Sequence, residues 1–584
     1  MHHASDQPRA SIYYDYQVHD AWLPSAHGPQ TRQPVVIAGG GPVGMTCALE
    51  LARHGVRAVV LESERQVSEG SRAICFTRRS MEILQQVGVD QAITEMGLPW
   101  RFGNSYYRGQ RVFRMENPHN ENDRFAPIIN LQQQYLEAFL AQACASHPLI
   151  DLRWGNRVTG VVQHDDHAVL TVDTPEGPYT LEADWLVAAD GARSFLRSAL
   201  GLKLEGSSYE GHFVIADIRV DLPLPTERLA FFDPEWNPQN TVLMHREPHN
   251  IWRIDYQLPR SETPEQALAP ESLRERINAQ LAMIGHGDQP WELDWCSVYS
   301  ARTLTLPDYR CDRTWFIGDA AHLLPIFGVR GANTGFQDAQ ALAWRLGLVA
   351  SAQAPESLLD TYSQERVAAA WEIIDEASKS TRFMAPPSPG FRLLRDAVLS
   401  LSLHEDFVRP LYHWRTSRPH EYRDSALNAI DDDNAQFDAG PGPGAPPNNV
   451  RLGDDDFLLD HLGGGFDLLL FGECASLTAD VWTTIQSWRR RGLKLRVTVI
   501  QGPSVSPLAA EPHQTSATDG DAARTPWDQL LQDPQGNAPT RWCLLDGHAA
   551  YLLRPDQHVC ARWRQLSAAR LDAALTRAST GAST

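Results

Sequence analysis

The segment from Val35 to Gly44 constrains the possible folds of this chain more than any other. Its sequence, VVIAGGGPVG, passes from β-branched residues into a Gly-x-Gly-x-x-Gly turn, and an Ala/Leu-rich stretch of helical composition follows to about His54. A second apolar run then ends in an acid, Glu62. A strand, a glycine turn, a helix, a strand and an acid in this order predict a dinucleotide-binding unit.

Four residues of this unit have separate predicted roles. Gly39 permits the tight turn, Gly41 lets the backbone approach a pyrophosphate, and Gly44 lets the helix pack close to the strand. The free N–H groups at the start of the helix can then bind phosphate. Glu62 lies about 20 residues further on, where a carboxylate accepts hydrogen bonds from ribose hydroxyls. A glycine turn alone is common, but the flanking strands and the acid favour cofactor binding.

The composition excludes some classes of partner. The 584 residues are 42% hydrophobic and carry a formal net charge of −20, so we expect neither nucleic acid nor an anionic membrane surface as a partner. No apolar run is long enough to span a membrane, and the N-terminus lacks the features of a secretory signal. The eight cysteines contain no Cys-x-x-Cys pair. We therefore expect no metal site, no dithiol centre, and reduced thiols in a cytoplasmic protein.

The distribution of apolar, proline and glycine residues predicts several segments. Short strands separated by Pro- and Asn-rich turns indicate a mostly antiparallel sheet inserted into an α/β framework. The sequence DAGPGPGAPPNN is too rich in glycine and proline to form a core, so it predicts a linker. The expected segments are an N-terminal arm (1–33), a dinucleotide-binding domain with following helices (34–210 and 301–424), the inserted sheet (211–300), the linker (425–450) and a C-terminal α/β domain (451–584).

Two later motifs place an acid at the end of a predicted strand. Asp190 follows the apolar run that precedes ADGARS, and Asp319 follows the run that precedes DAAH. The carboxyl ends of strands in an open α/β sheet are where ligands bind. Asp319 can bind a ribitol or ribose hydroxyl, whereas Asp190 could equally be the cap of the helix that follows it.

A glycine-rich loop precedes a long predicted helix. Glycines 328, 331 and 335 would let the backbone lie against a planar ring, and the helix N-terminus would face a partial negative charge such as a flavin pyrimidine oxygen. His322 has no partner at metal-ligand spacing, so we interpret it as a histidine that contacts the backbone or supports another residue.

Together, GGGPVG, ADGARS and GDAAHLLP resemble the three fingerprints of the single-component FAD-dependent aromatic hydroxylases, in the branch of phenol hydroxylase and 3-(3-hydroxyphenyl)propionate hydroxylase. The resemblance extends from about 34 to 424 and implies a Rossmann-like FAD-binding domain with the inserted sheet as the substrate domain. The runs GFDLLLFG and AYLLRPDQHVCARWR resemble the thioredoxin-like C-terminal extension of the phenol hydroxylase branch, here without Cys-x-x-Cys.

The resemblance assigns roles to further residues. Arg72 would contact the ribityl–phosphate region and Gln133 the pyrophosphate, and Asp190 would serve both FAD and the pyridine nucleotide. Pro325 would place its carbonyl beside the reacting edge of the flavin. The cofactor-binding residues expected are Gly39, Gly41, Gly44, Glu62, Arg72, Gln133, Asp190, Asp319, Gly331 and Asn333.

Candidates for catalysis are Pro325, Arg253 and Tyr256. Arg253 and Tyr256 lie on opposite faces of one predicted strand, and the sequence does not tell which face meets the flavin. His212, His245 and Tyr256 all remain open as the catalytic base.

The resemblance implies that NADPH or NADH binds transiently and reduces the flavin, and that O2 then gives a C4a-hydroperoxide, which hydroxylates an electron-rich phenolic or amino-aromatic ring. We expect a homodimer. Two alternatives remain: a flavin epoxidase or hydroxylase that tailors polyketides or antibiotics, and a flavin-bound interaction scaffold.

Overall fold

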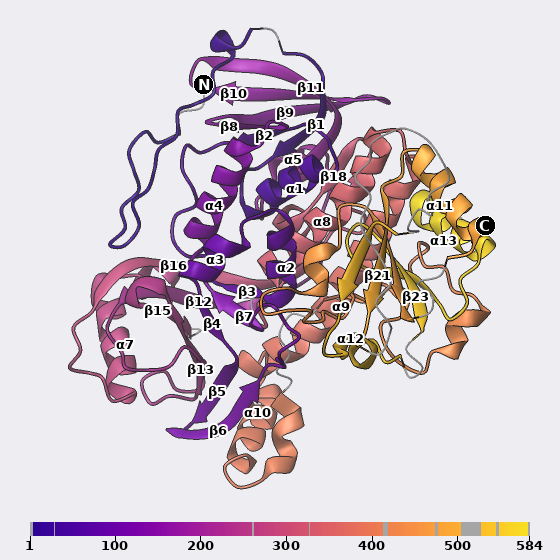
Figure 1. Cartoon of the computed structure of the whole chain (residues 1–584). Helices are drawn as coiled ribbons and strands as arrows, with labels where there is room; N and C mark the ends of the chain where they lie inside the picture. The colour runs from indigo at the N-terminus through magenta and orange to yellow at the C-terminus, as the bar shows by residue number, and fades with distance from the viewer. Residues whose placement is uncertain are drawn as a thin grey trace.

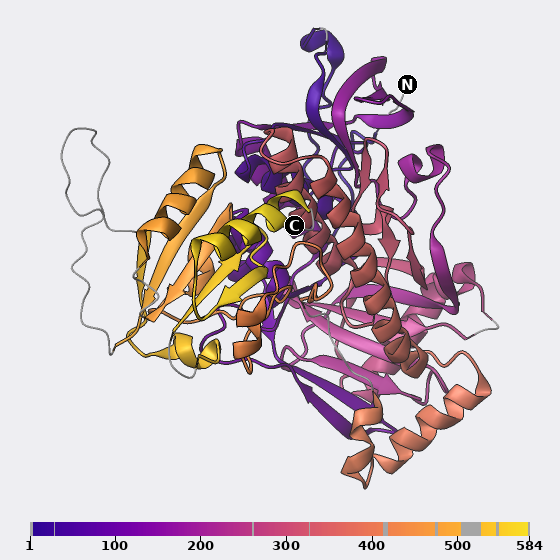
Figure 2. The ribbon, with the colours of Figure 1, turned by 90° about the vertical axis from the view of Figure 1, so that its right-hand side faces the viewer.

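The computed structural model describes residues 4–28, 30–259, 262–325, 327–412, 419–472, 477–503, 527–544 and 548–581. It contains two eight-stranded sheets, a five-stranded sheet and a three-stranded sheet. The first two belong to the predicted dinucleotide-binding domain and to the sheet predicted to bind substrate, called the substrate sheet below, and the five-stranded sheet forms the C-terminal domain beside them (Figures 1 and 2). The fold class is the predicted one.

The sheet of the dinucleotide-binding domain is mostly parallel. Its order is β17-β18-β11-β1-β2-β8, with β9 and β10 attached through β11. Strands β18, β11, β1, β2 and β8 pair in parallel. Their apolar runs are buried because the strands are covered on both faces. The strands are β1 (Gln33–Ala38), β2 (Ala58–Glu62), β8 (Ile150–Trp154), β9 (Arg157–Gln163), β10 (Ala168–Thr174), β11 (Gly177–Ala188), β17 (Arg310–Cys311) and β18 (Thr314–Phe316).

Helices and a small sheet complete this domain. The helix α8 is buried along nearly its whole length and packs against α1 in the core of the sheet. The helices are α1 (Pro42–Arg53), α2 (Arg78–Gln86), α3 (Asp90–Met96), α4 (Gln133–Ser146), α5 (Phe195–Ala199), α8 (Gly331–Ala350), α9 (Ser357–Met384) and α10 (Pro389–Leu401). The small sheet has the order β3 (Cys75–Thr77), β7 (Ile128–Asn130) and β4 (Leu98–Trp100).

The substrate sheet is larger than the sequence predicted. Reasoning from the sequence confined it to 211–300, but it also includes β5 and β6, which precede this range by about a hundred residues, and the short β19, which follows it. Parallel pairing of β5 with β13 is long-range, so no local pattern indicated it. The order is β19 (His322–Leu323), β16 (Glu292–Thr305), β12 (Glu205–Arg219), β15 (Ile251–Gln257), β14 (Thr241–Glu247), β13 (Arg228–Phe232), β5 (Phe102–Tyr107) and β6 (Gln110–Glu116).

The two faces of this sheet have different neighbours. One face carries Ile254 and Tyr256 and packs under α7 (Pro270–Met283), which follows the short α6 (Pro264–Ala267). The other face turns toward the dinucleotide-binding domain, where Phe213 packs edge-on against Phe327 of the loop that precedes α8, with ring centroids 5.3 Å apart. Because side chains alternate along a strand, Arg253 and Asp255 lie on this second face.

The C-terminal domain has the thioredoxin arrangement. The unit β20–α11–β21 is parallel, and an antiparallel hairpin, β23–β24, pairs on the other side of β20 before α13. The elements are β20 (Phe466–Phe471), α11 (Ala479–Arg490), β21 (Leu495–Gln501), β22 (Gln529–Gln532), α12 (Asn537–Arg541), β23 (Ala549–Leu553), β24 (Val559–Trp563) and α13 (Ala568–Thr580).

The segment predicted as a linker lies against the domains that it connects. Gly444 N–H donates to Val559 O, and its carbonyl accepts from Tyr422 N at 2.8 Å. A Cβ at Gly444 would lie 2.2 Å from Tyr422 O. Glycine is therefore required here for close backbone approach, which differs from the flexibility that the composition suggested.

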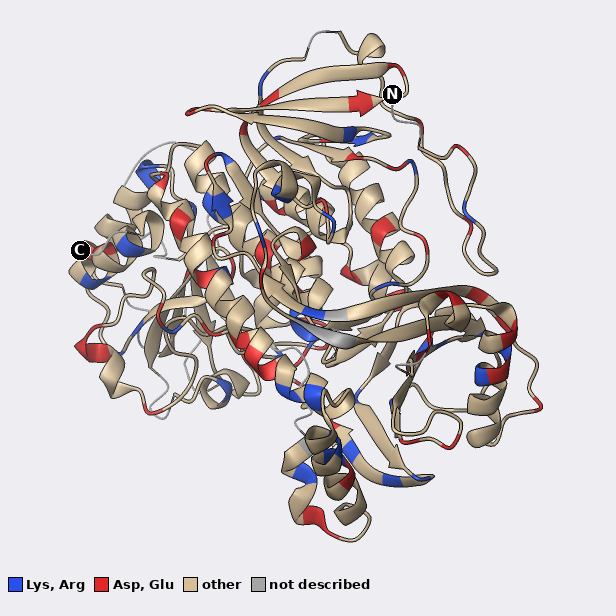
Figure 3. Ribbon diagram, turned by 180° about the vertical axis from the view of Figure 1, so that it is seen from behind, with Lys and Arg blue, Asp and Glu red and all other residues tan. Residues whose placement is uncertain are grey.

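The N-terminal arm connects two regions. Its backbone contacts the dinucleotide-binding domain where Arg9 N donates to Gln66 at 3.0 Å, and it contacts the substrate sheet where Ser11 Oγ donates to Asp294 at 2.6 Å. Acidic and basic residues are interspersed over the described part of the molecule (Figure 3).

Candidate functional site

The parallel strand order brings the predicted cofactor residues to one edge. Strands β18, β11, β1 and β2 are neighbours, and their carboxyl ends lie together. Asp319 follows β18, Asp190 follows β11, the glycine turn follows β1, and Glu62 ends β2. Four segments far apart in the sequence therefore form one site, as expected for an open α/β sheet.

The glycine turn fits a pyrophosphate. A Cβ at Gly39 would lie 2.3 Å from Ala189 O, and one at Gly44 would lie 2.1 Å from Gly39 O, so both glycines are required by the fold. A Cβ at Gly41 would meet nothing within 4 Å. Gly41 is the N-cap of α1, where the helix N–H groups are free to bind an anion. The open space in front of Gly41 is thus suited to the phosphates of a dinucleotide.

Two of the acids at this edge also hold the backbone. Glu62 accepts from Gly40 N and Glu64 N, each at 2.8 Å, and burial raises its pKa. Asp190 Oδ2 accepts from Leu196 N at 3.0 Å, so it binds an N–H group in the first turn of α5, whose N-cap residue is Ser194. Its Oδ1 is buried and accepts no hydrogen bond from any described residue. Asp190 therefore keeps one oxygen for a ligand.

Cations surround Asp319. Its side chain is exposed at the site, and Arg72 and Arg197 are near enough to interact with its charge. Arg197 also donates to Ala320 O at 3.0 Å. Gln133 lies next to Arg72, because its Oε1 accepts from Ala73 N at 2.9 Å. Arg72 is exposed, so it is free to meet a phosphate in this acidic protein.

The side chain of Asn333 is bound within the protein. It is 2% exposed, accepts from Thr77 N and Ser80 Oγ, and donates to Cys75 O and Val329 O. These bonds attach the start of α8 to β3 and α2 and leave no free polar atom of the side chain for a cofactor. Gly331 begins α8, and a Cβ there would meet nothing within 4 Å.

His322 and Asp338 form a buried pair that the sequence did not reveal. His322 Nε2 lies 2.6 Å from Asp338 Oδ2, and the same oxygen accepts from Gly318 N at 3.0 Å. Asp338 thus holds both ends of the segment that carries Asp319. The sequence signal that could have revealed this pair is Asp338 itself, the single acid in the apolar helix α8. Burial alone would raise the pKa of Asp338, but the charges of Arg366 and His322 outweigh it and the pKa is lowered.

The sheet face toward this site contains a buried arginine with acids around it. Arg253 Nε donates to Asp217 Oδ1 at 2.9 Å, and its Nη1 donates to Arg72 O at 3.0 Å. Glu247 Oε1 lies 3.6 Å from Arg253 Nε, and burial and Asp217 raise the pKa of Glu247 well above its usual value. Arg253 is therefore bound within the protein and joins the substrate sheet to the backbone at Arg72.

Asp255 and Tyr299 lie further along the same face. Asp255 is 8% exposed, and burial raises its pKa to about 7, with Arg253 opposing the shift. Tyr299 stacks on Phe213 at 5.5 Å, and its hydroxyl makes no hydrogen bond to any residue that the structure describes. The carboxyl of Asp255 and the hydroxyl of Tyr299 therefore lie on the same face as the contact between Phe213 and Phe327, where they can bind a polar group of a ligand.

The other residues predicted for catalysis have different surroundings: His245 pairs with Arg253 across β14 and β15 and shares its face, whereas Tyr256 lies on the opposite face. Tyr256 packs under α7, with its ring 5.5 Å from that of Trp236, so it faces away from the side of the sheet that carries Arg253. Burial and two arginines lower the pKa of His245 to about 3, which makes it a weak base. His212 Nδ1 lies 3.0 Å from Ser300 Oγ. Pro325 is buried two residues before Phe327.

Residues 32–377 match the FAD binding domain family. The chain belongs to this FAD-binding family. The 3-(3-hydroxy-phenyl)propionate/3-hydroxycinnamic acid hydroxylase of Shigella sonnei (strain Ss046) is 27% identical over 531 residues, which cover 90% of this chain and 91% of that protein. The enzyme of the same name from Escherichia coli (strain SMS-3-5 / SECEC) gives the same identity and coverage. These relatives confirm the resemblance that the three motifs predicted.

Solved structures of FAD-binding proteins share the fold. The flavin-dependent monooxygenase PieE, solved with FAD and substrate, has a TM-score of 0.75 at 22% identity and covers 94% of this chain and 99% of its own. Aklavinone-11 hydroxylase, solved with FAD and aklavinone, has a TM-score of 0.73 at 23% identity and covers 94% of this chain and 100% of its own.

The described residues contain neither a membrane-spanning helix nor a cluster of metal ligands. No described helix combines the length and the apolarity needed to cross a membrane. Within the same ranges, no group of three or more His, Cys, Asp or Glu side chains could hold a metal ion.

Proposed function

We propose that this FAD-binding protein is an NAD(P)H-dependent monooxygenase that hydroxylates an electron-rich aromatic ring bearing a hydroxyl or amino group. The observation that carries the proposal is a cofactor edge that fits FAD, facing a sheet with a buried aromatic cluster, the buried carboxyl of Asp255 and the Tyr299 hydroxyl, which has no hydrogen-bond partner among the described residues. The curated relatives, named as hydroxylases of hydroxyphenyl compounds over nine-tenths of the chain, support the same reaction.

The residues at the sheet edge would hold the cofactor. Gly41 and the start of α1 would bind the pyrophosphate, Glu62 a ribose, and Asp319 with Arg72 the ribityl–phosphate region. When bound, FAD supplies the electron transfer and oxygen activation that hydroxylation requires. Asp190, with one buried oxygen free, would serve the pyridine nucleotide as well as FAD.

The substrate would lie against the sheet face that carries Asp255 and Tyr299. Phe213 and Phe327 offer ring contacts there. The ionised Asp255 can accept a hydrogen bond from a phenol, and Tyr299 can donate or accept one. The apolar surroundings exclude water from this region, which strengthens both interactions. A ring with a hydroxyl or amino group would therefore be favoured over an unsubstituted one.

Substrate-stimulated oxidation of NADH or NADPH tests this function. The holoprotein is mixed with each nucleotide, O2 and a panel of hydroxylated and aminated aromatic acids, and the product mass is measured. We expect stimulated consumption and a product heavier by one oxygen. A protein that binds FAD but shows no stimulation with aromatic acids or with polycyclic phenols would favour the scaffold alternative.

We also propose that the chain forms a homodimer. Several apolar side chains of α10 and of the 3-10 helix η4 (Asp406–Tyr412), which project from the body in Figure 2, are exposed; they are Phe391, Leu393, Leu394, Leu401, Phe407 and Leu411. Apolar residues gathered in this way are typical of protein interfaces. Light scattering on the eluting protein would give the mass, and a monomer at micromolar concentration would contradict the proposal.

A further inference from the structure

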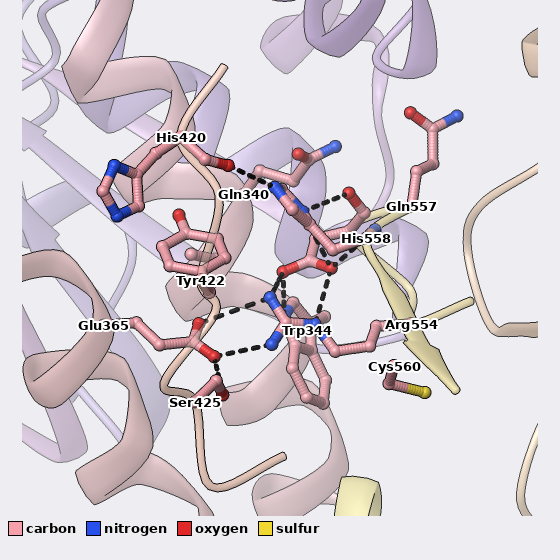
Figure 4. A network of polar contacts seen from close by, with 12 residues as sticks. Gln340, Trp344, Glu365, His420, Tyr422, Ser425, Arg554, Gln557, His558 and Cys560 are labelled. Atoms are coloured by element: carbon pink, nitrogen blue, oxygen red, sulfur yellow. Dashed lines mark hydrogen bonds and ion pairs between the residues drawn. The ribbon is translucent and has the colours of Figure 1, made fainter. Parts of the chain in front are cut away.

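The C-terminal domain docks through buried ion pairs rather than through apolar contacts alone. Arg554, between β23 and β24, is fully buried and donates to Glu365 Oε1 of α9 at 2.6 Å and to Asp556 Oδ2 at 2.7 Å. Trp344 of α8 donates to Asp556 Oδ2 at 3.1 Å. Figure 4 shows these groups converging between the hairpin and the two helices.

Tyr422 connects this cluster to the interior of the FAD-binding domain. Its ring lies 5.3 Å from the Arg554 guanidinium carbon and 4.8 Å from the His558 ring. Its hydroxyl accepts from Arg366 Nη1 at 2.7 Å. The ring is thus placed by the C-terminal domain, and the hydroxyl meets an arginine of α9 that is 1% exposed.

The path continues to the cofactor edge. Arg366 Nε donates to Asp338 Oδ1 at 2.6 Å, and the other oxygen of Asp338 binds His322 and Gly318 N. Asp319 lies between these two attachment points, and Pro325 follows three residues after His322. Every side chain from Arg554 to His322 along this path is more than nine-tenths buried, so the contacts of the path are shielded from water.

We propose that Tyr422 is a positioning residue for the FAD site, which transmits the docking of the C-terminal domain through Arg366 and Asp338 to Asp319 and the Pro325 loop. In a close-packed interior, a side chain with buried partners on both sides moves only when they move. The C-terminal domain then affects the flavin site indirectly, since along this path none of its residues contacts the cofactor edge. The inference requires FAD binding but does not depend on the hydroxylation reaction.

Tyr422→Phe tests this inference in the full-length protein. The variant keeps the ring between Arg554 and His558 but removes the acceptor for Arg366. Tyr551→Phe is the matched control, because it removes a buried hydroxyl from the core of the C-terminal domain on the side away from α8. FAD affinity is measured by titrating the apoprotein, together with the visible spectrum of the bound flavin and the melting temperature of the apoprotein.

We expect Tyr422→Phe to shift the flavin spectrum and to weaken FAD binding by up to about tenfold, because the loss of one hydrogen bond to a charged group sets the upper limit of an effect that this internal contact transmits to the cofactor. Tyr551→Phe should leave both unchanged. If Tyr422→Phe does not fold, Arg554→Lys, which keeps the charge but loses the paired geometry, takes its place with the same expectation. Unchanged affinity and spectrum, or equal changes in the control, would overturn the proposal whether or not the protein hydroxylates aromatic compounds.

Discussion

At the scale of single residues, Asp319 is the acid most directly placed for the cofactor. It is exposed at the sheet edge with Arg72 and Arg197 close by. We expect Asp319→Ala to lower the FAD occupancy of the purified protein, because the ribityl hydroxyl loses its acceptor. The ratio of flavin to protein absorbance measures occupancy, and Asp288→Ala, an exposed acid outside the site, is the control. Equal occupancy in both variants would remove Asp319 from the FAD site.

Asp255 predicts a pH dependence of stability. Its folded pKa of about 7 lies above its ordinary value of 3.8, with burial as the main cause. The folded state therefore holds more protons than the unfolded state between these values, and the free energy of unfolding falls as pH rises from about 4 to about 7. Glu247 contributes in the same direction.

The variant Asp255→Asn should lose less unfolding free energy between about pH 4 and pH 7 than the parent protein, since an amide does not titrate. One pKa unit corresponds to about 1.4 kcal/mol, so the variant should recover at most a few kcal/mol at pH 8 relative to pH 4. Urea unfolding of both proteins at several pH values gives the two slopes. If the free energy of unfolding changes with pH by the same amount in both proteins, Asp255 does not cause the pH dependence.

At the scale of elements, two glycines of the same turn predict opposite phenotypes. Gly41→Ala places a methyl group in open space at the N-cap of α1, which costs the apoprotein about 1 kcal/mol or less, but the methyl group occupies the predicted pyrophosphate position. Gly44→Ala places its methyl group 2.1 Å from a backbone oxygen, and such overpacking costs about 1–3 kcal/mol.

Gly41→Ala should therefore fold as the parent does and lose FAD affinity, whereas Gly44→Ala should lose stability even without FAD. Urea unfolding of the apoproteins and FAD titration separate the two effects. Wild-type affinity in Gly41→Ala would show that the phosphates bind elsewhere.

The sequence was informative where function depends on local pattern and less so where it depends on long-range contacts. The glycine turn and the acids Glu62, Asp190 and Asp319 could be predicted, because each directly follows or ends a strand, and parallel strands end at one edge. The direction of Asn333 could not, since its partners come from β3 and α2. Which side of the sheet Tyr256 faces could not be predicted either, because that depends on where α7 packs.

At the scale of the whole molecule, the C-terminal domain covers part of the FAD-binding domain. Trp344, Leu348 and Leu358 of α8 and α9 share one apolar cluster with residues of β20 and α13. Arg79 of α2 donates to Gln557 Oε1 at 2.8 Å and to Asp556 O at 2.9 Å. The two domains thus share a core as well as buried charges, so the chain after about Gly440 is an integral part of the fold.

Removal of the chain after Gly440 should therefore cause aggregation or a changed oligomer. Truncation would expose the apolar side chains of α8 and α9 and leave Arg79 with fewer partners, both of which are costly. Gel filtration and dye binding to apolar surface measure the outcome. A soluble truncated protein with normal FAD affinity would contradict the structural role of this domain.

The cysteines of this domain should not matter for turnover. Cys543 is exposed and Cys560 is buried with its thiol against Leu552 O at 3.4 Å, while Cys474 lies outside the described residues. Burial raises the pKa of Cys560 to about 12, so this thiol is unreactive at neutral pH. The triple change of these cysteines to serine should keep substrate-dependent NAD(P)H oxidation and lose only modest stability from the buried position. A triple variant that folds, binds FAD at full occupancy and yet has lost turnover would show that the domain has a thiol-dependent role.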